Sequence, residues 1–171
     1  NPSTEIDILT EDGIIEITRD NDNSFKYNYT VGEYTNINKI EDLIEILTND
    51  KNYQGKTIIL NNDLDFNDNN SYKDINNKVN EINPKDIFKG TFNGNGHVVE
   101  HLRDYVYIGN DEGHGLFGST DTGSIIKNVG VIDVDLNCYA YVGALVGHSK
   151  SEITNCYSTG NIIRSYHIAG G

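Results

Sequence analysis

The pattern of apolar and polar residues predicts two short strands at the start of the chain. The runs GIIEITRD (13–20) and FKYNYTVGEY (25–34) are rich in β-branched and aromatic residues. The polar residues NDNS lie between them and favour a turn. We therefore expect residues 1–37 to form a small β segment or cap, which we treat as a first region of the chain.

The next stretch, TNINKIEDLIEILTND, changes period and predicts the one helix of the chain. Its apolar residues follow the i, i+3, i+4, i+7 spacing of an amphipathic helix, at Ile40, Leu43, Ile44 and Leu47. Asn38 is placed to cap the start, with Glu41 three residues on, and Asn49 is placed to close the end. We expect this helix to cap the β structure that follows.

After the helix the sequence returns to strand-like patterns. KTIILNNDLDF (56–66) predicts a buried strand that runs into an acidic corner. Residues 67–86 are too polar to pack well and indicate a long surface loop.

Residues beyond 86 are repetitive, and this repetition determines the expected fold. Three pairs of segments match at offsets of 29, 27 and 26 residues, namely 116–118 with 145–147, 126–129 with 153–156, and 142–144 with 168–170. A repeat of this length with short β runs and no helix is typical of a β-solenoid. The unit therefore has about 27 residues, two short strands and glycine corners.

The repeat also predicts which residues stack on one another. We expect Leu116 over Leu145 and Ile126 over Ile153 in the core, with Asn128 and Asn155 forming a two-rung polar ladder at a corner. The glycines are expected to supply backbone dihedrals that a Cβ would forbid.

Several of these segments resemble the GLUG motif, a repeat of secreted and surface proteins of bacteria. GLFG (115–118) and VGALVG (142–147) resemble the motif itself, FKGTFNGNGHVVEHL (88–102) its entry sequence, and NCYSTGNI (155–162) its linking segment. Asn93 and Ala144 depart from the usual Asp and Gly. The resemblance covers about residues 38–171, which we treat as the second region.

The resemblance implies an all-β fold, a right-handed parallel β-helix-like solenoid. It also implies a non-catalytic structural or adhesion module of an extracellular or cell-wall-associated bacterial protein, with a host protein, matrix protein or glycan as partner. Proteins that contain the repeat include IgA-specific metalloendopeptidases and adhesin-like proteins. The alternatives are therefore a non-catalytic segment of a secreted metalloendopeptidase, or a carbohydrate-active β-helix enzyme. The last repeat stops before its Leu-Val-Gly, so we expect further repeats in the parent chain.

Charge narrows the range of partners. The formal net charge is −13, which argues against nucleic acid and against docking on anionic lipid, since both need clustered Lys and Arg. No apolar run approaches the ~18 residues of a membrane span, and the start, which lacks Met, has no signal-peptide pattern. Cys138 and Cys156 both lie in apolar contexts, and we expect both to be reduced.

One short motif suggests a metallopeptidase. His97-Val98-Val99-Glu100-His101 matches H-x-x-E-H, which binds zinc when it lies on a helix. Here the flanking glycines and the β-branched pair predict a strand, on which the two histidines stand roughly 13 Å apart. A single zinc ion with Zn–N distances of about 2.1 Å cannot reach both. We expect Glu100 and His101 to face opposite sides of that strand.

The acidic corner is the other candidate metal site. Asp63, Asp65, Asn67 and Asp68 offer oxygen ligands in an order that loosely resembles the start of an EF-hand calcium loop. Asp68, however, stands where that loop needs Gly, and no Glu closes it. We expect a solvated corner, with calcium as the alternative.

The remaining histidines and carboxylates predict no other chemistry. His114, His148 and His167 fall near repeat corners, where exposed histidines are common, and no Ser-His-Asp order or G-x-S-x-G elbow is present. The sequence thus predicts no catalytic residues and no cofactor.

Overall fold

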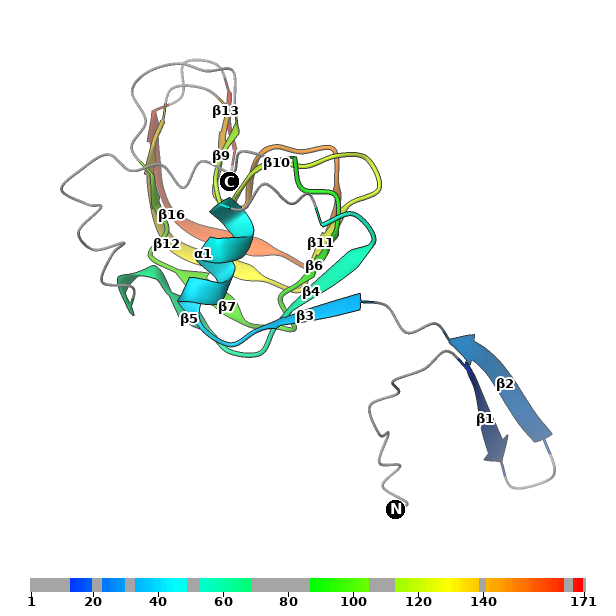
Figure 1. The fold of residues 1–171 in the computed structure, drawn as a ribbon. Coiled ribbons are helices and arrows are strands. Elements are labelled where there is room, and N and C mark those ends of the chain that lie inside the picture. Colours follow the sequence, from blue (N-terminus) through cyan, green and yellow to red (C-terminus); the bar gives the residue numbers. More distant parts are fainter. Residues whose placement is uncertain are drawn as a thin grey trace. The chain divides into compact units, whose positions relative to one another are not determined.

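The computed structural model describes residues 13–19, 23–29, 33–48, 53–68, 87–104, 113–138, 141–164 and 168–170 (Figure 1). Contacts divide the chain into two units, Asn1–Glu33 and Tyr34–Gly171. This division falls ahead of the boundary expected at residue 37, because β3 (Glu33–Ile37) joins a sheet of the second unit. Most of the polar loop predicted at 67–86, and Asn49, lie outside the described residues.

The first unit contains two antiparallel strands, as the sequence predicts. β1 (Gly13–Arg19) pairs with β2 (Asn23–Tyr29) over its whole length, with Gly13 opposite Tyr29. The second predicted strand was expected to continue to residue 34, but β2 ends at Tyr29.

The second unit is mostly β, and its described residues contain one α-helix, α1 (Ile40–Thr48), and one 3₁₀ turn, η1 (Phe66–Asp68). Its remaining strands are short: β4 (Lys56–Leu60), β5 (Leu64–Asp65), β6 (Thr91–Asn93), β7 (Val98–Glu100), β8 (Arg103–Asp104), β9 (Gly113–His114), β10 (Phe117–Ser119), β11 (Ile125–Lys127), β12 (Gly130–Asn137), β13 (Tyr141–Gly143), β14 (Val146–His148), β15 (Glu152–Thr154), β16 (Tyr157–Arg164) and β17 (Ile168–Gly170).

These strands form parallel sheets in which the chain returns to each sheet several times. One sheet has the order β15-β11-β6-β4-β3, a second the order β16-β12-β7-β5, and a third the order β17-β13-β9, while β10 pairs with β14. Within this unit, the described strands from β4 onward pair in parallel. We call one passage of the chain through the first two sheets a pass. Four passes follow one another, β4–β5, β6–β7, β11–β12 and β15–β16.

The register of the passes aligns apolar residues in the interior. Ile58 lies opposite Phe92, Phe92 opposite Ile126, and Ile126 opposite Ile153. Ile58, Phe92 and Ile126 are fully buried, whereas Ile153 is 45% exposed. The spacing between paired residues is 34, 34 and then 27, so only the last step has the length that the sequence repeat predicts.

The predicted stacking is confirmed at two of the three matched segments. Phe117 pairs with Val146 at an offset of 29, and Ile126 with Ile153 at an offset of 27. The third offset is also 27 rather than 26, because Gly143 pairs with Gly170. The prediction that Ile153 is buried is wrong, because it lies on the outermost described strand of its sheet, where no further strand shields it.

The helix is confirmed. Leu43 and Leu47 are buried and belong to the same core cluster as Ile58. At the start of the helix, the side-chain oxygen of Asn38 accepts a hydrogen bond from Asn61 (3.0 Å), and its backbone N–H donates to the carboxylate of Asp42 (3.4 Å). Asp42 is therefore an acidic partner at this helix start.

The glycines of the repeat serve both unusual dihedrals and close approach, and Gly123, with a φ of 89°, has the kind of dihedral that was expected. A Cβ on Gly113 would collide with the carbonyl oxygen of Gly118, and one on Gly147 with the backbone nitrogen of His114. Neither Gly113 nor Gly147 has a positive φ. Several corners with positive φ are instead formed by Asn, Asp or His, residues that tolerate that conformation. The expected role of the glycines is thus corrected at these two positions.

The polar ladder at the corner after β11 extends over three passes. Asn155 Nδ2 donates to Asn128 Oδ1 (2.9 Å), and Asn128 Nδ2 donates to Asn93 Oδ1 (3.1 Å). Asn128 and Asn155 both have a positive φ, near 55°. The predicted pair is therefore confirmed, and Asn93 adds a third rung.

Cys138 is buried, Cys156 is half-buried, and both are free thiols, as expected. Among the described residues, the one α-helix is too short to cross a membrane.

We predict that Leu116→Ala destabilises the chain more than Leu145→Ala. Leu116 is fully buried, so its truncation leaves a cavity and should cost about 2–5 kcal/mol. Leu145 is only partly buried against the core. The same change should therefore lower the free energy of unfolding by clearly less than the about 2–5 kcal/mol expected for a fully buried leucine. Urea unfolding of the two variants measures both losses, and equal losses would contradict the difference in packing.

Candidate functional site

Polar side chains of the corner after β4 meet those around β7 in three cross-strand pairs. His97 Nδ1 lies 3.0 Å from Asp63 Oδ1, and His101 Nδ1 lies 2.8 Å from Asp65 Oδ1. Arg103 then donates to Asn67 Oδ1 at 3.3 Å. These three pairs form because β5 and β7 are parallel, with Leu64 opposite Val99 and Asp65 opposite Glu100. This register brings together two segments that are about 35 residues apart in the sequence.

The first pair is anchored by the backbone. Asp63 Oδ1 also accepts a hydrogen bond from the backbone N–H of Val98 (3.0 Å). That bond first, and the contact with His97 second, hold the pKa of the Asp63 carboxyl below its ordinary value. Asp63 is largely exposed, with 65% of its side chain accessible, so this pair makes a surface contact.

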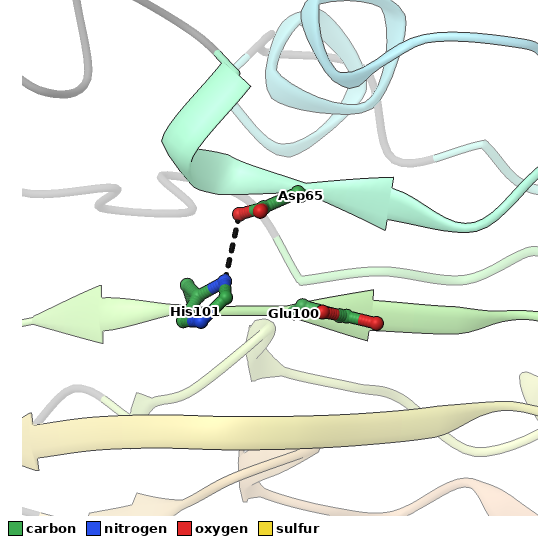
Figure 2. Close-up of side chains that lie close together, drawn as sticks. All are labelled: Asp65, Glu100 and His101. Atoms are coloured by element: carbon green, nitrogen blue, oxygen red, sulfur yellow. Dashed lines mark hydrogen bonds and ion pairs between the residues drawn. The ribbon is translucent and has the colours of Figure 1, made fainter.

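The second pair lies beside a further carboxylate. Asp65, Glu100 and His101 are all half-buried, and one ligand atom from each lies within 4.8 Å of the others. Figure 2 shows Asp65 on β5, facing the neighbouring segment that carries Glu100 and His101, with the contact from Asp65 to His101 marked. Carboxylate oxygens and an imidazole nitrogen are a donor set that binds divalent metal ions.

A backbone kink places His101 on the same side as Glu100. Val99 and Leu102 are both buried, so the two residues between them point outward. His101 has a φ of 58°, in the left-handed region, which breaks the alternation of a regular strand. The expectation that Glu100 and His101 face opposite sides is therefore wrong.

The same kink recurs in the next pass. Val131 and Val134 are buried, and Asp133 between them has a φ of 52°. Ile132 pairs with Glu100, so Asp133 occupies the position that His101 has one pass earlier. The apolar spacing of three, Val-x-x-Val or Val-x-x-Leu, is the signal in the sequence that could have revealed this kink.

The structure thus joins the two stretches that the sequence presented separately. The H-x-x-E-H stretch includes strand β7, as expected, and not a helix. Its Glu100 and His101 gather with Asp65 of the acidic corner, whereas His97 contacts Asp63. In the corner, the oxygens of Asp63, Asp65 and Asn67 each face a donor from the next pass, and calcium binding there stays the alternative to a solvated corner.

The other predicted histidines lie apart from this cluster. His114 is buried rather than exposed, with 5% of its surface accessible, and its strand β9 contacts β10, β13 and β14. His148 is exposed and its ring stacks on Tyr141, with centroids 5.4 Å apart. His167 lies outside the described residues.

A hollow of about 260 Å³ opens near the last described pass. Apolar side chains form much of its wall, with Leu145, Val146 and Ile153 on one part and Cys156 and Tyr157 on another. Tyr157 is 58% exposed and Ile153 45%. The hollow is therefore an uncovered part of the core rather than a polar cleft.

Comparisons with known proteins support the repeat. The family described as the GLUG motif matches residues 139–163, which include VGALVG but not the earlier GLFG. Halomucin of Haloquadratum walsbyi is 25% identical over 105 residues, which are 61% of this chain and 1% of halomucin. The chain thus spans a very small part of that relative. No solved structure matches the chain.

We predict that Asp63 titrates below the ordinary value of about 3.9. The main cause is the hydrogen bond from the Val98 N–H. His97→Asn should therefore raise the pKa of Asp63 only part of the way to its ordinary value. Because the pKa is lower in the folded state, the stabilisation from Asp63 is present above the unfolded pKa. It is lost as the pH falls through the folded pKa. Carbon-13 NMR of the carboxyl group measures this, and an ordinary pKa in the unaltered chain would contradict it.

Proposed function

We propose that Tyr34–Gly171 is a segment of a right-handed parallel β-solenoid, a non-catalytic structural or adhesive module of a secreted or cell-surface protein. The observation that carries this proposal is the aligned stack of Ile58, Phe92, Ile126 and Ile153 on four successive passes. No pass can bury its apolar face alone, so each depends on its neighbours, as in repeat proteins. The right hand follows from the strong preference of parallel crossover connections.

The exposed last pass supports an array that continues with further repeats. Ile126 is fully buried and Ile153, at the same register one pass later, is 45% exposed. The difference is the covering that a neighbouring pass provides. Another pass in the same register would cover Ile153 and Tyr157 and fill the hollow beside them.

The character of the surfaces supports a non-catalytic role. Active-site pockets combine an apolar lining with a few convergent polar or charged groups. The described residues that line the hollow beside the last pass include no charged side chain. Asp65 lies on β5, the other paired Asp and His residues lie next to the ends of β5 and β7, and Asp63 is largely exposed. The GLUG motif supports an extracellular or cell-wall location, and an acidic surface supports a host protein, matrix protein or glycan as partner rather than a nucleic acid.

A chain in which residues 141–167 are duplicated tests the solenoid. Strand β17 pairs with β13 at an offset of 27, so a duplicate of that length inserts one pass in register. We expect unfolding to stay cooperative and the thermal midpoint to rise, because each added interface contributes stability.

A duplicate of residues 141–160 is the matched control, since it adds similar residues out of register. It should lower the midpoint, because the slip moves apolar side chains to the surface. Equal midpoints for the two lengths would overturn the proposed stacking.

For the non-catalytic role, the purified chain should leave casein and a set of polysaccharides intact. Mass spectrometry and reducing-sugar release after prolonged incubation, with and without Zn²⁺, measure this. Turnover that Glu100→Gln or Asp65→Asn abolishes would overturn the proposal and assign catalysis to this cluster.

A further inference from the structure

We propose that Asp65, Glu100 and His101 bind one divalent first-row metal ion of the Zn²⁺ type. Together they offer one imidazole nitrogen and two carboxylates, with ligand atoms within 4.8 Å of one another (Figure 2). Ligands of one zinc ion lie at about 2.0–2.2 Å from it, so two of them are at most about 4 Å apart. Closing the cluster around an ion therefore requires side-chain shifts of about 1 Å or less.

The donor set selects the class of ion. Imidazole suits zinc and its first-row neighbours, whereas calcium and magnesium take oxygen ligands. Two carboxylates neutralise the charge of a divalent ion, and three protein ligands leave a position for water, which is common at zinc. The chain as a whole carries a formal charge of −13, which favours the approach of cations.

The fold holds these ligands in place before an ion arrives. Asp65 and Glu100 are directly paired in the parallel register of β5 and β7. Asp65 Oδ1 accepts a hydrogen bond from the backbone N–H of Asn67 (2.7 Å), which fixes the rotation of that carboxylate. The kink at His101 turns its ring toward Asp65, with 30% of each side chain exposed. An ion can reach such a site from solvent.

An ion here would link two passes of the chain. Asp65 belongs to the first pass, and Glu100 and His101 to the end of the second, 35 and 36 residues later. Because the ligands come together only in the folded chain, binding would stabilise the fold. The ion would therefore stabilise the contact between the two passes, whether or not the chain is an adhesion module.

Isothermal titration of the full chain with ZnCl₂ near pH 7.5 tests this site. We expect one saturable equivalent and, at excess metal, a rise of the melting temperature of about 5 °C or more. Asp65→Asn, Glu100→Gln and His101→Asn should each raise the dissociation constant at least about tenfold. Asn is chosen at position 101 because it tolerates the positive φ found there.

The neighbouring pair supplies matched controls. Asp63→Asn and His97→Asn make the same chemical changes in a pair that lies outside the ligand group, so each should change the constant by less than about twofold. Cys156→Ser, which removes a half-buried thiol, should leave it unchanged as well. The proposal would be overturned if the chain bound no saturable equivalent of Zn²⁺, or if the control variants lost as much affinity for Zn²⁺ as the three ligand variants.

A measurement on the unaltered chain covers the case in which a variant fails to fold. In ¹H–¹⁵N NMR of the histidine rings, His101 should respond first as Zn²⁺ is added, ahead of the other four histidines. A first response elsewhere, or displacement of Zn²⁺ by an equal concentration of Ca²⁺, would overturn the assigned site.

Discussion

The parallel register that places Ile58, Phe92 and Ile126 over one another is the constraint on which the larger unit depends. Each strand of this stack is only a few residues long and presents one or two buried side chains to the interior, too little to hold a pass by itself. The apolar surface becomes continuous only when passes align. Slipping one strand by a single residue would turn its buried residue outward.

The same alignment explains the polar and glycine positions. Equivalent corners of successive passes lie next to one another, so Asn93, Asn128 and Asn155 satisfy each other's side-chain amides. Where backbones approach most closely, at Gly113 and Gly147, no side chain fits. The stacking of passes therefore requires these asparagine and glycine residues at these positions. A short sequence motif such as GLUG can identify them for this reason. The match to residues 139–163 reaches from β13 into β16, and among the described strands β14, β15 and β16 have a paired strand on one side only.

The cluster of Asp65, Glu100 and His101 is a consequence of the register combined with a kink. The register sets Asp65 beside Glu100, and the left-handed φ of His101 adds the ring to the same side. The neighbouring Asp63 and His97 form a pair of the same type without a second carboxylate in the group. Polar contacts thus join two passes from outside while the apolar stack joins them from inside. This arrangement suits a structural module.

By itself, the sequence determined the elements whose signal is local. The helical spacing of Leu43 and Leu47 predicted α1, and the repeated Leu-x-Gly and Asn positions predicted the stacked segments and the Asn128–Asn155 contact, since side-chain periodicity and repeats are properties of the chain. Whatever depends on how passes align was decided by the tertiary structure. The exposure of Ile153 depends on a covering neighbour, and the burial of His114 on the strands around it. The contact of Asp65 with His101 joins residues 36 apart through a kink, and no local pattern encodes such a distance.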